Sequence, residues 1–575
     1  MEIKKIWEKN YDSGVSAKLE IVKDETLNDM VINACNKFKN KIAYCNFGAN
    51  LTFTEFNRQI EYLASYFQNE LGLQTGDKIA IQLPNLLQNP VSLFAALRAG
   101  LVVVNTNPLY TPREMKFQFK DSGAKAIIIL DNFLHNLEEI IDQTDIKHVI
   151  STKAGDQLGC VKGKIVDFVV KYIHKGIPKH NLKTVTFNEA LKIGSRKKLN
   201  APKLRADDIA FLQYTGGTTG RSKAAMLSHK NILTNVKQVE NWFGNEPVTK
   251  EDFVCSPLPL YHIFSLTCNC MTFLNIGCTN LLITNPKDMN SFTKDLMKYP
   301  VTIITGVNTL FIGLLKHKNF DKINWKRYRT IVAGGTSLQR PVFEEFKKRT
   351  GKAIVEGYGL TEASPLVTCN PINPRGERNK AGTIGLPLPG TEVCFFDEKG
   401  SIVTDDTIGE LAVRGPQVMK GYWNNTQETN KVLVNDWLFT GDIGYMDKDG
   451  YIKIVDRKKD MILVSGFNVY PNEIEEIIVS HPDVVDCAVV GIEDVCTGER
   501  PVAVVVKSNI DLTEEELRDH CKKNLTKFKV PVWVFFVEDL PKSNVGKILR
   551  RVVRENVVKI IQERNLKTRN VEKNS

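Results

Sequence analysis

The sequence has 575 residues, of which 42% are hydrophobic and 25% charged, with 38 Gly and 23 Pro. This composition excludes collagen-like, coiled-coil and wholly disordered chains, and the length predicts about two to four folding units. The net charge is +11, and the 12 cysteines are scattered without a C-x-x-C pair, which favours reduced thiols in a cytoplasmic protein.

Strand-like apolar runs alternate with helical patterns over most of the chain. The first residues, 1–14, contain no apolar run of signal-peptide length, so we expect no secretory signal. Strands are predicted at residues 78–83, 101–105, 124–130, 301–307 and 330–335, and helices at 91–99 and 339–349. Such alternation is typical of α/β layers. The Lys-rich residues 176–206 are predicted to form a loop-rich connection.

One long segment, residues 253–286, contains no Asp, Glu, Lys or Arg. It is long enough to cross a bilayer. However, Pro257, Pro259, His262 and Gly277 interrupt it, together with several Asn residues. We therefore predict a buried strand–helix–strand segment rather than a membrane span.

The pattern changes after residue 384, where short strands with Gly- and Asp-rich turns predict a β subdomain. Beyond the charged junction 455–461, helices at 472–480 and 514–523 alternate with apolar strands. We therefore predict two domains: 1–458, with α/β layers plus the β subdomain, and a small α+β domain at 459–575.

The C-terminal residues 542–575 contain ten Lys and Arg against three Glu. Apolar residues recur there at helical spacing: Ile548, Leu549, Val552, Val553, Val557, Ile560 and Ile561. Two interpretations stay open. The helix lies on anionic lipid, or it packs on the domain and continues into a solvated tail.

The stretch LQYTGGTTGRSKAAM, residues 212–226, has the composition of a phosphate-binding loop. Its glycines let backbone N–H groups approach a polyanion, its threonines donate hydrogen bonds, and Lys223 supplies a positive charge. The residues that form this loop are Thr215, Gly216, Gly217, Thr218, Thr219 and Gly220. It is not a Walker loop, because Arg221 and Ser222 separate the last glycine from the lysine.

This loop resembles the signature of the adenylate-forming superfamily, which includes acyl-CoA synthetases, luciferase-like enzymes and peptide-synthetase adenylation domains. Further motifs follow in the same order: EGYGLTE (356–362), TGD (440–442), VDRKKDMI (455–462) and PKSNVGK (541–547). The whole chain is similar to bacterial long-chain-fatty-acid–CoA ligases, for example in NPLYTPRE (107–114) and LPLYHIF (258–264). One departure is Ala224, where the family usually has Gly. We expect a mild effect, since Gly is required only where φ is positive.

The resemblance implies a large N-terminal adenylating domain with a distorted β subdomain and a small mobile C-terminal domain. It also implies that ATP and Mg²⁺ activate a long-chain fatty acid to acyl-AMP, which then reacts with coenzyme A. A homodimer and loose contact with the inner face of the membrane follow from the same likeness. We expect no nucleic-acid partner.

The resemblance also implies roles for individual residues. Thr218 and Glu362 would form the Mg²⁺ and phosphate centre, and Lys547 would neutralise charge during adenylation. His262 would line the carboxylate and thioester site. Lys459 would be the hinge, and Ser465, Gly466, Phe467 and Asn468 the loop facing coenzyme A. The remaining ATP and AMP contacts would come from Tyr214, Thr215, Gly216, Gly217, Thr219, Gly220, Lys223, Gly334, Gly335, Gly357, Tyr358, Gly359, Thr361, Asp442 and Arg457.

A structural alternative accompanies several of these roles. Tyr358 would stack on adenine and Asp442 would bind ribose, but a Tyr between glycines also suits a core and TGD also suits a turn. Glu362 also suits the first turn of a helix. His262 also suits a hydrogen-bonded core position.

Two other functions fit parts of the pattern. An acyl-AMP ligase would pass the acyl group to a carrier protein instead of coenzyme A. A lipid-binding component with a regulatory nucleotide site would form no AMP.

Overall fold

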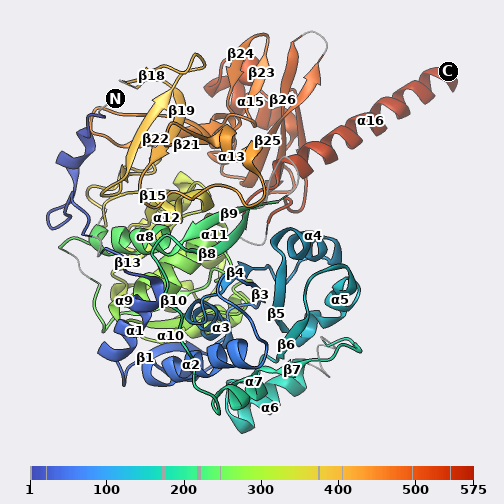
Figure 1. The fold of residues 1–575 in the computed structure, drawn as a ribbon. Coiled ribbons are helices and arrows are strands. Elements are labelled where there is room, and N and C mark those ends of the chain that lie inside the picture. The colour runs from blue at the N-terminus through green and yellow to red at the C-terminus, as the bar shows by residue number, and fades with distance from the viewer. Residues whose placement is uncertain are drawn as a thin grey trace.

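The computed structural model describes residues 3–20, 23–170, 177–215, 222–245, 248–372, 376–404, 406–494, 497–543 and 546–574, without the side chains of residues 160 and 564–574. Four sheets form the molecule (Figure 1). Two large sheets make up the N-terminal α/β layers, a third forms the β subdomain, and a fourth forms the C-terminal domain. This is the α/β architecture that the sequence predicts.

The largest sheet has nine strands and is parallel in its middle, with antiparallel strands at both edges. In spatial order its strands are β16 (Leu386–Pro387), β15 (Leu366–Cys369), β14 (Val355–Gly359), β13 (Thr330–Ala333), β12 (Ile303–Gly306), β10 (Phe253–Ser256), β11 (Thr279–Leu282), β1 (Ile42–Asn46) and β2 (Ala49–Thr52).

The second sheet has seven strands and is parallel except for its last hairpin. Its order is β7 (Val185–Thr186), β6 (His148–Thr152), β5 (Ala124–Leu130), β3 (Lys78–Gln82), β4 (Val102–Asn105), β8 (Ile209–Thr215) and β9 (Lys223–Ser228). Strands such as β4 are buried along their whole length. A parallel strand covered on both faces needs such a continuous apolar run.

Helices cover and separate these sheets. They are α1 (Leu27–Lys37), α2 (Phe53–Asn69), α3 (Gln88–Arg98), α4 (Pro112–Ser122), α5 (Leu134–Glu138), α6 (Cys160–Phe168), α7 (Phe187–Gly194), α8 (His229–Trp242), α9 (Phe273–Ile276), α10 (Met289–Lys298), α11 (Asn308–Lys316) and α12 (Arg340–Thr350). Every residue of α3 is buried. Capping boxes begin α1, α2, α4 and α8, where a Thr or Ser and the residue three positions later satisfy each other's backbone N–H groups.

The β subdomain contains β17 (Glu392–Phe396), β18 (Ile402–Val403), β19 (Gly409–Arg414), α13 (Thr426–Val432), β20 (Leu433–Val434), β21 (Trp437–Met446) and β22 (Ile452–Arg457). The next strand, β23 (Ile462–Val464), already belongs to the C-terminal sheet. The connection between the two sheets therefore falls within the junction predicted from the sequence.

The C-terminal sheet contains β23, β24 (Phe467–Val469), β25 (Val484–Asp494), β26 (Gly498–Lys507) and β27 (Trp533–Phe536). One apolar cluster joins it to α14 (Pro471–Val479) and α15 (Glu514–Asn524), and a second joins it to α16 (Arg550–Asn574). Val553 and Val557 of α16 are buried against this sheet. The sequence left two interpretations of this helix: contact with anionic lipid or packing on the domain. The structure supports packing on the C-terminal sheet for the apolar residues up to 561.

Two further predictions, for residues 253–286 and 176–206, can be compared with the structure. The uncharged segment 253–286 is β10, a buried π-helix (Ser265–Thr272), α9 and β11, so the prediction of a buried segment is confirmed. No described helix is long and apolar enough to cross a membrane. The prediction of a loop-rich connection at 176–206 is partly wrong, because α7 forms there. Phe187 and Ala190 are buried, and the lysines around them obscured this short amphipathic pattern.

Candidate active site

The phosphate loop connects β8 to β9. Gly216, Gly217, Thr218, Thr219 and Gly220 lie outside the described residues, so their roles stay predictions. The two ends of the loop are described: Thr215 pairs with Lys223 in the β8–β9 register, and the Ser222 hydroxyl donates to the Thr215 carbonyl oxygen at 2.5 Å. Ala224 is a buried strand residue without positive φ, so this backbone has no need of a glycine.

Lys223 is held by a carboxylate that sequence reasoning did not identify. Its ammonium pairs with Glu428 of α13 and lies 5.2 Å from the centroid of the Tyr422 ring. Hydrogen bonds from Lys223 and Lys431 lower the pKa of Glu428 to about 2. Lys223 therefore has a protein counter-ion at the position where the sequence predicts a phosphate.

Tyr214 points into the protein rather than along the loop. It is 8% exposed, and its hydroxyl donates to Asp121 of α4 at 2.6 Å. Burial, followed by Asp121, raises the pKa of this hydroxyl far above its usual value. The hydroxyl is therefore occupied by a structural hydrogen bond, and a nucleotide contact by Tyr214 stays a prediction.

Glu362 lies in a short 3₁₀ helix, Thr361–Ala363, that follows β14. Its Oε1 accepts a hydrogen bond of 2.7 Å from the hydroxyl of Tyr422. The carboxylate also lies near enough to Arg457 for its charge to raise the pKa of that guanidinium. Tyr422 therefore fixes the orientation of the predicted metal-binding carboxylate. A sequence signal was available, because Tyr422 lies in the stretch GPQVMKGYW (415–423), which also resembles the bacterial long-chain-fatty-acid–CoA ligases.

Tyr358, Asp442 and Arg457, which the sequence predicts separately, meet at one place. The Tyr358 hydroxyl donates to Asp442 Oδ2 at 2.5 Å, and Arg457 Nε lies 3.0 Å from Asp442 Oδ1. Asp442 and Arg457 are opposite each other in the β21–β22 pair. Burial and the Asp442 carboxylate raise the pKa of Tyr358 well above its usual value. TGD lies within strand β21, where Gly441 has φ +72°, so the motif does not form a separate turn, and ribose binding by Asp442 stays a prediction.

The predicted glycines have packing reasons of their own. A Cβ at Gly359 would lie 2.2 Å from the Pro365 carbonyl oxygen, and one at Gly334 would lie 3.2 Å from the Gly357 carbonyl oxygen. Gly335 has φ +81°, which favours glycine. The structure therefore requires glycine at Gly359 for packing, makes Gly334 a tight fit and favours glycine at Gly335 through its backbone conformation. The contacts of these glycines and of Thr361 with ATP stay predictions.

Lys547 brings the C-terminal domain to this site. Desolvation, and then the charge of Arg457, lowers its pKa to about 8, while Asp442 acts in the opposite direction. In turn, burial and then the Lys547 charge lower the pKa of His262 to about 4. The neighbouring Gly546 fits against α11, where a Cβ would lie 2.4 Å from Thr309 Oγ1. Residues from three parts of the chain thus converge on one charged centre.

His262 is neutral at physiological pH because of this low pKa. The Phe264 backbone N–H donates to its Nδ1 at 3.4 Å, which leaves the proton of the neutral ring on Nε2. A neutral imidazole beside Lys547 can donate one hydrogen bond without adding a second positive charge. His262 is half-buried, and its contact with the carboxylate of a substrate stays a prediction.

The predicted hinge and the coenzyme A loop lie in different surroundings. Desolvation, and then the charge of Arg457, lowers the pKa of Lys459, which is thus close to the charged centre. By contrast, the Ser465 N–H donates to the Thr497 carbonyl, and the Phe467 ring stacks on Phe528 at 5.0 Å. These partners belong to the C-terminal domain. The structure therefore brings Lys459 and Lys547 to the site and leaves the 465–468 loop on its own domain.

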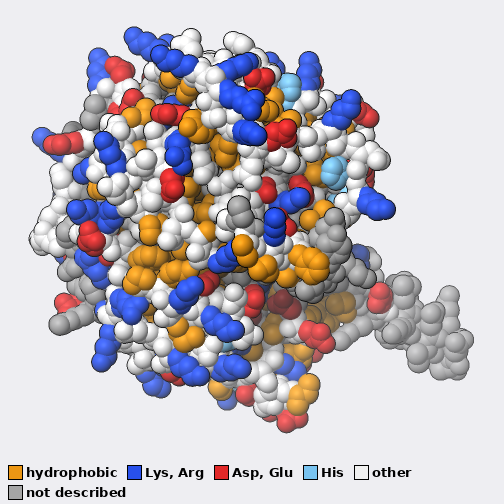
Figure 2. All heavy atoms as spheres, turned by 90° about the horizontal axis from the view of Figure 1, so that it is seen from below, with side chains coloured by type: hydrophobic (Ala, Val, Ile, Leu, Met, Phe, Trp, Pro, Cys, Tyr) orange, Lys and Arg blue, Asp and Glu red, His pale blue; other side chains and the backbone are white. Residues whose placement is uncertain are grey.

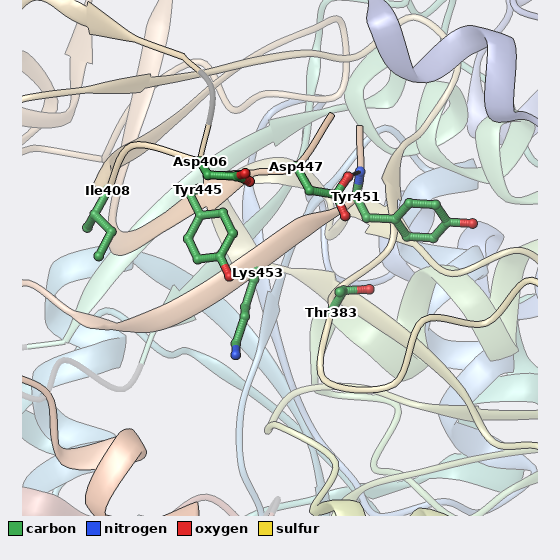
Figure 3. Close-up of a pocket in the computed structure, with 7 residues that line it drawn as sticks. All are labelled: Thr383, Asp406, Ile408, Tyr445, Asp447, Tyr451 and Lys453. Carbon is green, nitrogen blue, oxygen red and sulfur yellow. Dashed lines mark hydrogen bonds between the residues drawn. The ribbon is translucent and has the colours of Figure 1, made fainter. Parts of the chain in front are cut away.

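A separate pocket of about 430 Å³ opens on the β subdomain (Figure 3). Tyr445 and Lys453 lie on the neighbouring strands β21 and β22. The lining residues are Thr383, Asp406, Ile408, Tyr445, Asp447, Tyr451 and Lys453. None of them is a predicted site residue, so this pocket is distinct from the charged centre.

The family models of the AMP-binding enzyme and of the AMP-binding enzyme C-terminal domain match residues 32–423 and 473–547. A long-chain-fatty-acid–CoA ligase of Escherichia coli O157:H7 is 48% identical over 96% of this chain and 98% of its own. One of Bacillus subtilis (strain 168) is 36% identical over 96% of this chain and 98% of its own.

Among solved structures, ATP-bound MatB from Rhodopseudomonas palustris matches with a TM-score of 0.79 and 28% identity, over 92% of this chain and 99% of that one. These matches agree with the charged centre described above. The two family models match in chain order, the relatives align over almost their full length, and the solved structure has the same fold. The chain therefore belongs to the AMP-binding enzyme family and, within it, to the bacterial long-chain-fatty-acid–CoA ligases.

Proposed function

We propose that this chain activates a long-chain fatty acid with ATP and transfers the acyl group to coenzyme A. In the first step a carboxylate oxygen of the fatty acid attacks the α-phosphorus of ATP, and pyrophosphate leaves. In the second step the thiol sulfur of coenzyme A attacks the acyl carbon, its proton is lost, and AMP leaves. The observation that carries the proposal is the convergence of Lys547 with Asp442 and Arg457.

The first step joins two anions, so it needs positive charge and positioning more than proton transfer. Lys547 and Arg457 supply positive charge at the centre. Asp442, which accepts a hydrogen bond from Tyr358, would bind the ribose hydroxyls, and the ring of Tyr358 would stack on the adenine. His262 would hydrogen-bond the carboxylate of the fatty acid through Nε2.

Mg²⁺ fits the donors at this site. Glu362 offers one carboxylate that Tyr422 orients, and the described residues contain no cluster of three or more His, Cys, Asp or Glu that could hold a metal by themselves. Mg²⁺ commonly binds through one or two carboxylates, several waters and substrate phosphates. Glu362, with the hydroxyl of Thr218, would hold the ion and so neutralise the phosphates.

The second step requires a different arrangement of the two domains. We place their boundary at residues 458 and 459 and the hinge at Lys459, where β22 ends and the C-terminal sheet begins. A rotation there would withdraw Lys547 and bring the loop of Ser465, Gly466, Phe467 and Asn468 to the acyl-adenylate. The exposed Phe467 is available for such a contact.

Cytoplasmic location, contact with the inner face of the membrane and a homodimer complete the proposal, and all three come from the likeness to the ligase family. The decisive assay is exchange of labelled pyrophosphate into ATP in the presence of fatty acids from hexanoate to octadecanoate. Exchange that depends on the fatty acid, followed by thioester formation with free coenzyme A, is the expected result. No exchange with any acid would refute the proposal, and a thioester on a carrier protein alone would identify an acyl-AMP ligase.

A further inference from the structure

Helix α6 turns one face to the protein and the opposite face to solvent. On the inner face, the Gly155 N–H donates to Asp167 at 2.8 Å, and a Cβ at Gly163 would lie 2.3 Å from the Gly155 carbonyl oxygen. This close contact fixes the orientation of the helix. The residues on its opposite side are therefore held outward by the packing of the inner face.

The outward face carries large apolar side chains. Val161 is 76% exposed and Ile165 58% exposed, and their spacing of four places them above one another on the helix. Phe168, which is 58% exposed, lies on the same side. Single exposed apolar residues are common on proteins, but a group of them on one helix face marks an interaction site.

The tip of the β1–β2 hairpin extends this face. Phe47 in that turn is 44% exposed, and its carbonyl oxygen accepts a hydrogen bond from the ammonium of Lys162. The next residue, Gly48, is close to a second ammonium, since a Cβ there would lie 3.7 Å from Lys298 Nζ. We call the set of Phe47, Val161, Ile165 and Phe168, with Lys162, Lys164 and Lys298, the α6 surface.

The charges of the α6 surface are mainly positive. Lys162 and Lys164 are exposed and flank the apolar face of the helix. Among the nearby acidic groups, Asp167 points inward to Gly155, and Asp156, close to Asp167, accepts hydrogen bonds from Thr152 and Lys153. Asp295 is half-buried and within reach of the Lys298 and Lys162 charges. Figure 2 shows the molecule from the side on which α6 lies in Figure 1, with groups of hydrophobic side chains among Lys and Arg.

We propose that the α6 surface rests on an anionic phospholipid bilayer, with its apolar side chains at the acyl boundary and its lysines among the headgroups. Apolar side chains flanked by lysines are the pattern of interfacial helices, and each lysine gains from the negative surface potential. If a second copy docked by the same face, the lysines of the two copies would face each other. This repulsion disfavours a symmetric dimer at the α6 surface.

The α6 surface would supply the membrane contact that is part of the proposed function, and this inference rests on that function for the membrane contact and for the lipid nature of the substrate. In Figure 1, α6 lies at the end of the molecule opposite the C-terminal β25–β26 sheet. A protein that docks by α6 thus keeps its C-terminal domain away from the bilayer. Rotation of that domain between the two steps would not require release from the membrane.

The test is co-sedimentation of the full chain with vesicles of phosphatidylcholine alone or mixed equally with phosphatidylglycerol. We expect binding to the mixed vesicles that weakens at high salt. Val161→Asp with Ile165→Asp lowers the partition coefficient about tenfold or more. Lys162→Glu with Lys164→Glu abolishes the preference for phosphatidylglycerol. Ile510→Asp, at a residue 82% exposed in the C-terminal domain, is the matched control and leaves binding unchanged.

Absence of wild-type binding, or equal binding of the Val161 and Ile165 double variant, would overturn the proposal. So would sedimentation velocity that shows this variant changing from dimer to monomer with vesicle binding unchanged, because the face would then join two copies. AMP release with octanoate, which needs no membrane, is expected to be equal in wild type and variants. This activity shows that the variants are folded, and absence of activity in wild type with every acid from hexanoate to octadecanoate would refute the proposed function without deciding the vesicle result.

Discussion

The hydroxyl of Tyr422 donates a hydrogen bond of 2.7 Å to Glu362, which precedes it by 60 residues in the chain. Tyr422 follows the β subdomain strand β19, whereas Glu362 follows β14 of the largest sheet. The bond therefore fixes a side chain of one unit by means of a residue of another. A carboxylate held by one oxygen keeps the other oxygen in a defined direction for a cation.

Tyr422→Phe is expected to slow adenylate formation about 10-fold to 100-fold, the cost of one hydrogen bond to a charged group. The effect should appear as a weaker response to Mg²⁺ in pyrophosphate exchange, since Glu362 loses its orientation. Tyr445→Phe, in the pocket of the β subdomain, is the control. An unchanged Mg²⁺ dependence in the Tyr422 variant would show that the bond has no part in metal binding.

Lys547→Ala is expected to reduce pyrophosphate exchange about 10²-fold to 10³-fold, because the developing negative charge loses its partner. Reaction of coenzyme A with pre-formed acyl-AMP should stay within about twofold of wild type, since in the proposed function this step would use the other domain arrangement. Lys523→Ala, on α15 of the same domain, controls for general effects of removing a lysine. Equal loss in both steps would exclude the proposed division of roles.

The pH dependence of adenylation follows from the lowered pKa of Lys547, about 8 against a usual 10.5. The protonated form is the active one, so kcat/KM for pyrophosphate exchange should be constant below about 8 and fall about tenfold per pH unit above it. Bound ATP adds negative charge near the ammonium and raises its pKa, so the decline in kcat should lie at higher pH.

Lys547→Arg distinguishes this ionisation from others, because guanidinium stays charged throughout the range. Whatever its absolute rate, this variant should show no decline in kcat/KM between about pH 8 and 10. A decline that persists near pH 8 would assign the ionisation to another group.

The ionisation of Glu428 makes the free energy of unfolding of the protein depend on pH. Its pKa is about 2 in the folded protein, against 4.5 for the free side chain. The folded state therefore gains stability from the ionised carboxylate above pH 4.5 and loses it as the pH falls toward 2. Glu428→Gln should lower the free energy of unfolding at pH 7 by about 1 kcal/mol, since the partly exposed pair is screened by solvent.

Urea unfolding of the wild type and the Glu428→Gln variant tests this at neutral pH and at a pH between 4.5 and 2. The difference between the two proteins should narrow below about pH 4.5 and should shrink at high salt. A difference that does not vary with pH would mean that the pair with Lys223 contributes through packing instead of charge.

The amino-acid sequence by itself determined which elements form and what chemistry they carry. Continuous apolar runs such as 126–130 predict buried parallel strands, and the uncharged residues 253–286 predict a buried segment, because burial on all sides disfavours charge. The capping boxes at Thr26 and Thr52 are equally local, since each needs only a partner three residues away. The order of the motifs was sufficient to predict the family, whereas the role of Lys547 stays a prediction.

Only the tertiary structure decided which side chain meets which. Glu362 and Tyr422, Tyr358 and Asp442, and Lys223 and Glu428 are separated by 60, 84 and 205 residues. No local periodicity encodes such pairs, because they depend on how separate sheets pack together. The same holds for apolar helix faces: Val553 and Val557 of α16 are buried against a sheet, whereas Val161 and Ile165 of α6 face solvent. Helical spacing is identical in the two cases, and the surrounding fold alone determines whether protein covers the face.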